Sequence, residues 1–138
     1  MAGPATVKAG ETLQLKESLL GTTTVVDVTV TNVKYNVKSA DGFSKPGKGQ
    51  FVTADVQVLV RQGKYSISSG SFKLVAKDGT AFDSTIALDG KDLSANDLAS
   101  GQKASGTVWF DVAKDAQTGG KVALKSILAE GDAGYWAL

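Results

Sequence analysis

Hydrophobic and polar residues alternate along residues 51–60, near the middle of the chain. Val or Ala occupies positions 52, 54, 56, 58 and 60, and a period of two is typical of a β-strand with one dry face. The other, mostly wet face carries Phe51, Thr53, Asp55, Gln57 and Leu59. Each buried Val contributes roughly 1.5–3 kcal/mol, so a register that exposed the valines is strongly disfavoured. The pattern predicts a central strand with Asp55 outside and Val56 inside.

Similar extended patterns recur along the rest of the chain. In residues 22–37 the apolar phase changes parity, which predicts a β-bulge or bend near Thr31 and Asn32, or two strands in line. Asp78-Gly79 predicts a hairpin turn between two strands. Further strands are expected at residues 11–16, 65–76, 80–86, 107–112, 121–127 and 134–138. About eight short strands with no convincing helix predict an all-β protein, either an antiparallel sandwich or a closed barrel.

The remaining segments are predicted to be tails and loops. Residues 1–10 are small and flexible and are expected to be an N-terminal tail or linker, followed by a single domain over residues 11–138. Residues 38–50 are predicted to be a loop that Phe43 pins to the body. Residues 87–100 are predicted to be a docked loop, with or without one short helical turn. Trp109 is expected to be buried rather than to form an exposed ligand platform.

Charge is balanced overall but unevenly distributed. The net charge of +1 argues against a nucleic-acid partner, and no apolar run is long enough for a membrane span. Residues 34–77 nevertheless carry eight basic and two acidic side chains. Such blocks usually only solubilise a surface, whereas the alternative is a contact surface for an anionic polymer or partner. The candidate interaction surface consists of Lys34, Lys38, Phe43, Lys45, Lys48, Arg61 and Lys64.

The sequence offers few residues or motifs that could form a catalytic or metal site. The chain has no Cys and no His, which excludes disulfides, thiol nucleophiles and thiolate or histidine metal ligands. Asp89, Asp92 and Asp97 suggest a calcium loop, but the EF-hand spacing and its closing Glu are missing. Ser69 and Ser71 stand at the wrong spacing from Lys73 for a Ser-x-x-Lys motif, and no Gly-x-Ser-x-Gly elbow occurs. We therefore expect no cofactor and no catalytic residue.

Several segments, taken in order, resemble a known family. The run Leu-x-Ser-Gly-Gln-x-x-x-Gly-x-Val-Trp-Phe-Asp-Val at residues 98–112 is similar to the late strand of the mycobacterial immunoprotective extracellular antigen family. It is also similar to related domains of unknown function from actinobacterial secreted proteins and lipoproteins. Residues 10–15, 49–58 and 72–79 and the terminal Tyr135-Trp136 agree with the same pattern. The resemblance implies an immunoglobulin-like β-sandwich, a secreted or envelope location and no established catalytic residues.

These observations favour a non-catalytic binding module of the cell surface, with an envelope protein or a glycan as its partner. The alternative is a structural or accessory domain of an envelope assembly, because one fold hosts many roles. A hydrolase is disfavoured by the missing site chemistry. The start of the sequence lacks the pattern of a signal peptide, so we expect the export segment to be absent from this sequence, and a lipid anchor upstream stays open. We expect a monomer.

Overall fold

The computed structural model describes residues 5–38, 47–85, 93–114, 119–125 and 131–138, most of which lie in strands. Within these ranges there are eleven strands, more than the eight expected, one short 3-10 helix and no α-helix. The elements are β1 (Ala5–Lys8), β2 (Thr12–Leu19), β3 (Thr22–Lys34), β4 (Gly49–Gln62), β5 (Tyr65–Ser68), η1 (Ser69–Ser71), β6 (Phe72–Val75), β7 (Ala81–Thr85), β8 (Ser94–Leu98), β9 (Lys103–Ala113), β10 (Lys121–Lys125) and β11 (Asp132–Ala137). The all-β prediction is confirmed.

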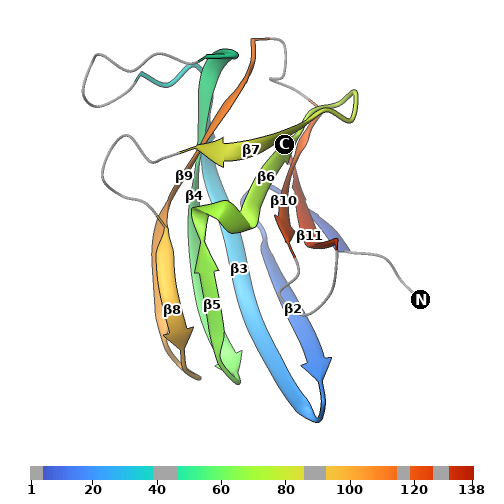
Figure 1. Ribbon diagram of the computed structural model, residues 1–138, viewed down its shortest axis with the longest axis vertical. Helices are drawn as coiled ribbons and strands as arrows, with labels where there is room; N and C mark the ends of the chain where they lie inside the picture. The colour runs from blue at the N-terminus through green and yellow to red at the C-terminus, as the bar shows by residue number, and fades with distance from the viewer. Residues whose placement is uncertain (1–4, 39–46, 86–92, 115–118, 126–130) are drawn as a thin grey trace.

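The strands form two layers (Figure 1). One layer has the order β9-β4-β3-β2, and its long strands run along the whole molecule in Figure 1. The other has the order β1-β11-β10-β6. Strand β7 pairs with β6 of one layer and with β9 of the other, so it joins them. All pairs are antiparallel except β1 with β11, and the arrangement is the predicted antiparallel sandwich.

The alternating valines of β4 lie in the core, as predicted. Val56 and Val58 are at most 2% exposed, and they stand opposite Val30 and Val28 of β3 in the strand register. β-Branched side chains pack well on a pleated surface, which explains why this ribbon is so long. The predicted bulge is also present, because the β3–β4 register shifts between Thr31 and Lys34, where Asn32 has a φ of 55°.

The second layer contributes aromatic residues to the core. Trp136 of β11 is fully buried beside Phe72 of β6, with ring centroids 6.4 Å apart. The Nε1–H of Trp136 donates a hydrogen bond of 3.1 Å to the carbonyl oxygen of Glu11, which ties β11 to the segment before β2. The terminal aromatic strand predicted from the sequence is therefore locked into the sheet.

Three sequence-based expectations need correction. Residues 1–10 were expected to be a flexible tail, but residues 5–8 form β1, which pairs with β11, while residues 1–4 lie outside the described residues. Residues 87–100 were expected to be a loop, but residues 94–98 form β8, which pairs with β5 in front of the lower half of the large sheet (Figure 1). Phe51 and Thr53 were placed on a wet face, but both are buried. Phe51 packs edge-on against Trp109, with ring centroids 5.5 Å apart.

The turns between strands show where the chain is strained. The Asp78-Gly79 hairpin is confirmed, since β6 and β7 pair directly across it. The β2–β3 hairpin closes through Leu20 and Gly21, which have φ values of 49° and 81°, as a type I′ turn requires. Leu20 is 96% exposed and stands in a conformation that a branched side chain disfavours. None of the described residues belongs to a helix that could cross a bilayer.

Candidate functional site

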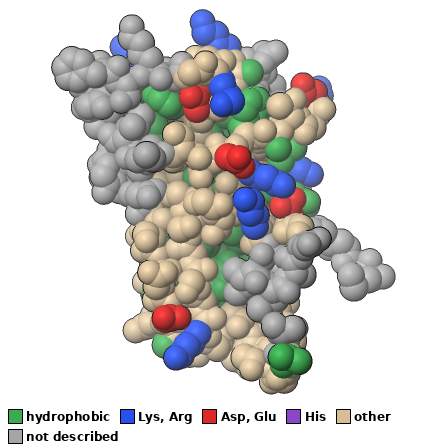
Figure 2. Space-filling view, viewed as in Figure 1, with side chains coloured by type: hydrophobic (Ala, Val, Ile, Leu, Met, Phe, Trp, Pro, Cys, Tyr) green, Lys and Arg blue, Asp and Glu red, His purple; other side chains and the backbone are tan. Residues whose placement is uncertain are grey.

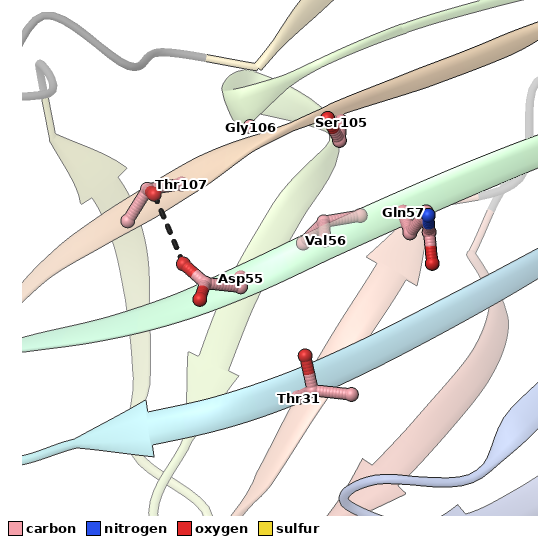
Figure 3. Close-up of a pocket in the computed structure, with 7 residues that line it drawn as sticks. All are labelled: Thr31, Asp55, Val56, Gln57, Ser105, Gly106 and Thr107. Atoms are coloured by element: carbon pink, nitrogen blue, oxygen red, sulfur yellow. Dashed lines mark hydrogen bonds between the residues drawn. The ribbon is translucent and has the colours of Figure 1, made fainter.

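A hollow lies on the outer face of β3, β4 and β9 (Figure 3). It has a volume of about 560 Å³. Its lining consists of Thr31, Asp55, Val56, Gln57, Ser105, Gly106 and Thr107. Because the inner face of these strands is filled by valines, the alternate side chains that point outward are polar. We call this hollow, with the two smaller ones that continue it at either end, the outer groove.

Cross-strand register arranges the polar side chains of the outer groove in rows. Thr31 of β3, Asp55 of β4 and Thr107 of β9 are directly opposite one another. The next row is Thr29, Gln57 and Ser105. Each row therefore presents hydroxyl, amide or carboxylate groups side by side, within the short distances typical of paired strands.

Asp55 is the centre of the groove. Its Oδ1 accepts a hydrogen bond of 3.0 Å from the hydroxyl of Thr107, which Figure 3 shows. Its Oδ2 accepts a hydrogen bond of 2.9 Å from the Nδ2 of Asn32, the bulge residue of β3. The bulge thus re-aims Asn32 towards β4. A carboxylate held from both sides keeps its remaining lone pairs available to a ligand.

One end of the groove carries a satisfied ion pair. A smaller hollow of about 210 Å³ there is lined by Asp27, Arg61 and Lys103, among others. The Nε of Arg61 lies 2.7 Å from the Oδ2 of Asp27, and the Nε2 of Gln14 donates to the Oδ1 of Asp27. Partial burial disfavours the charged form of Asp27, but these hydrogen bonds and the charge of Arg61 outweigh it and lower the pKa of the Asp27 carboxyl.

The other end holds an unsatisfied donor. A hollow of about 270 Å³ there is lined by Lys34, Thr53, Asp55 and Trp109, among others. Trp109 is buried, as predicted, and it is 2% exposed. Its Nε1 has no hydrogen-bond partner within the part of the chain that the structure describes. A buried donor without a partner is uncommon and calls for a functional or structural reason.

The predicted basic surface is divided between the two ends of the sheet. Lys34, Lys38 and Lys48 lie at the end where β3 finishes and β4 begins. Arg61 and Lys64 lie at the far end of β4, about 43 Å along the strand from Lys48 if each residue advances about 3.3 Å. Phe43 and Lys45 lie outside the described residues. The structure therefore brings three of these residues together at the Trp109 end and leaves two at the Asp27 end.

Neither a Ser–Lys hydrolase site nor a calcium site gains support from the described residues. Lys73 forms an ion pair with Asp132, with 3.2 Å between Nζ and Oδ1, and the hydroxyl of Ser71 accepts a hydrogen bond from the backbone N–H of Ser68. No group of three acidic side chains converges within the described ranges. Asp97 lies in β8, whereas Asp89 and Asp92 are outside those ranges, so the calcium loop that the sequence disfavours is not tested.

Sequence reasoning placed Asp55 and Gln57 on an outward face, but it did not identify the groove. The signal was the alternation itself, since Thr29 and Thr31, Asp55 and Gln57, and residues 105 and 107 are polar positions between apolar ones. Which of these positions lie opposite one another depends on the register of three strands. That register becomes visible only in the structure.

Two solved structures share this fold. The crystal structure of a secreted protein from Mycobacterium tuberculosis, MPT63, is similar over 100% of both chains, with 24% identity and a TM-score of 0.76. The crystal structure of the yjhA protein from Bacillus subtilis is similar over 90% of this chain and 85% of that chain, with 21% identity and a TM-score of 0.64. No curated protein sequence matches significantly.

The similarity to MPT63 confirms the resemblance to the mycobacterial extracellular antigen family and the immunoglobulin-like sandwich that it implies. The family described as "Domain of unknown function (DUF4352)" matches residues 20–133, which is most of the chain. The matched range includes β3, β4 and β9 and therefore most of the outer groove. This protein belongs to the DUF4352 family.

Proposed function

We propose that this protein is a non-catalytic extracellular binding module and that the outer groove binds a hydroxyl-rich ligand, such as a glycan of the cell envelope. The observation that carries the proposal is the pair of polar rows centred on Asp55 and Gln57. Sugar hydroxyls both donate and accept hydrogen bonds, so they match a lining of carboxylate, amide and hydroxyl groups.

The groove also has unused hydrogen-bonding capacity. The side chains of Gln57 and Ser105 make no hydrogen bond to other described residues, and both are exposed. Asp55 is oriented by Asn32 and Thr107 before any ligand arrives. Side chains that are already oriented lose less conformational freedom on binding, which favours affinity.

One observation supports an extracellular location. MPT63, which shares the fold over its full length, is described as a secreted protein.

Binding of soluble envelope polysaccharides, measured by isothermal titration calorimetry, tests the proposal. Gln57→Ala should weaken binding about fivefold, because a net hydrogen bond is worth about 1 kcal/mol. Ser66→Ala on β5, outside the groove, is the matched control and should leave binding unchanged. Loss of binding in Lys64→Gln but not in Gln57→Ala would instead favour the basic surface at the Asp27 end.

A further inference from the structure

The two ends of the outer groove differ in charge and in hydrogen bonding. At the Asp27 end the guanidinium of Arg61 already has a carboxylate partner. At the Trp109 end Lys34 is exposed, and within the described ranges it forms no ion pair. Lys34 of β3 shares a row with Thr53 of β4 and Trp109 of β9, so one strand separates it from Trp109, and both residues line the same hollow.

Further cations gather at the same end of the molecule. Gln50, which is 1% exposed, accepts from the backbone N–H of Asn36 and donates to the carbonyl oxygens of Ala113 and Lys114. It thereby fastens three chain segments together, and these segments carry Lys38, Lys48 and Lys114. All three lysines are exposed and none forms an ion pair with a described residue.

The carboxylates at this end are engaged by the protein itself. Asp111 accepts hydrogen bonds of 2.7 and 3.0 Å from the backbone N–H groups of Gly47 and Lys48. Asp55 accepts from Asn32 and Thr107. Among the described residues, this end therefore carries four exposed lysines, Lys34, Lys38, Lys48 and Lys114, against the two carboxylates, and their balance of charge is positive.

We propose that the Trp109 end is a carboxylate subsite and that the ligand of the outer groove is an acidic glycan, one that carries uronic acid units. This inference rests on the proposed function and adds the class of sugar. The ligand's carboxylate pairs with the ammonium of Lys34, which lies in the same row as Trp109 and its buried, unpaired Nε1–H. The two polar rows, Thr31-Asp55-Thr107 and Thr29-Gln57-Ser105, hold the sugar hydroxyls. Hydrogen bonds to charged groups are about twice as strong as neutral ones, so this subsite contributes strongly to selection of the ligand.

The two tryptophans provide an internal control for the test. Trp109 has a free Nε1–H, whereas the Nε1–H of Trp136 already donates to Glu11. Their two indole resonances are to be followed by ¹H–¹⁵N NMR during titration with a polyuronate oligosaccharide and, separately, with its carboxyl-reduced neutral counterpart. The polyuronate should shift the Trp109 resonance and leave that of Trp136 in place. The neutral counterpart should bind more weakly and leave both in place.

Variants give a second, independent measurement. Lys34→Gln should weaken polyuronate binding about fivefold and leave the affinity for the neutral counterpart unchanged, because a partly exposed ion pair contributes up to about 1 kcal/mol. Lys77→Gln, in the β6–β7 turn, removes an equal charge elsewhere and should change neither affinity.

The outcomes separate the two proposals. Equal binding of both oligosaccharides, with the Trp109 resonance unmoved, would overturn the carboxylate subsite and leave the glycan groove intact. Absence of binding for both would overturn the groove itself. Equal losses in Lys34→Gln and Lys77→Gln would mean that only the overall charge attracts the polymer, which also overturns the subsite.

Discussion

Replacing Val by Asp and replacing Asp by Val at two adjacent positions of β4 should have different effects on folding. We expect Val56→Asp to unfold the protein at pH 7 and Asp55→Val to leave it folded. Val56 is 2% exposed and lies between Val30 and Gly106 in the register, on the inner face. Asp55 lies on the outer face, in the groove.

The expected losses of folding stability in the two variants differ severalfold. Val56→Asp forfeits the burial of a valine, roughly 1.5–3 kcal/mol, and adds the cost of an unpaired buried charge, which is about several kcal/mol. The sum approaches the total stability of a typical domain, about 5–15 kcal/mol. Asp55→Val removes two hydrogen bonds, each worth about 1 kcal/mol net. A β-branched residue suits a strand and offsets part of this loss, so the net cost should stay below about 2 kcal/mol.

Urea unfolding followed by tryptophan fluorescence measures both variants, with far-ultraviolet circular dichroism as a check on strand content. Val56→Asn is the control that separates charge from shape, and it should be less destabilised than Val56→Asp. Val56→Asp should regain structure as the pH falls, because a protonated carboxyl is less costly to bury. Equal losses of stability in Asp55→Val and Val56→Asp would show that the assignment of the two faces is wrong.

Three further changes test other parts of the fold. Trp136→Phe should lower stability by about 2 kcal/mol, because the hydrogen bond to Glu11 and part of the buried ring are lost, and an unchanged urea midpoint would contradict this. Leu20→Asn should raise stability by about 1 kcal/mol and the melting temperature by roughly 3 °C, since Asn tolerates a positive φ; a lower melting temperature in a thermal scan would refute the argument. The pKa of Asp27 is lowered in the folded state, so its contribution is present above the ordinary Asp value of about 4 and is lost as the pH falls. Asp27→Asn should therefore flatten the fall in urea midpoint below about pH 4, and an unaltered curve would show that Arg61 and its carboxylate partner do not stabilise the fold.

The local sequence pattern was sufficient to predict those strands in which hydrophobic and polar residues alternate strongly. The valines of β4, the bulge near Asn32 and the Asp78-Gly79 turn were all predictable, because each depends on neighbours in sequence. Strand β8 was not, since Ser94–Leu98 has low strand preference and becomes extended by pairing with β5. Strand β1 was missed for the same reason, because its partner lies about 130 residues away.

The candidate site was also predictable only in those features that depend on neighbours in sequence. That Asp55 and Gln57 face outward follows from a period of two, whereas their alignment with Thr107 and Ser105 depends on how β4 meets β9. The charge excess of residues 34–77 was visible in sequence, but the length of β4 separates its members. Figure 2 shows a further consequence of folding, because acidic and basic side chains that are distant in sequence intermingle over β6, β7, β10 and β11.

The parallel pairing of β1 with β11 has a mechanical consequence. Four residues of β1, Ala5 to Lys8, run in register beside Gly134 to Ala137. Tension that draws the two ends of the chain apart along these strands would load all of their backbone hydrogen bonds together, in shear, instead of opening them one after another like a zipper.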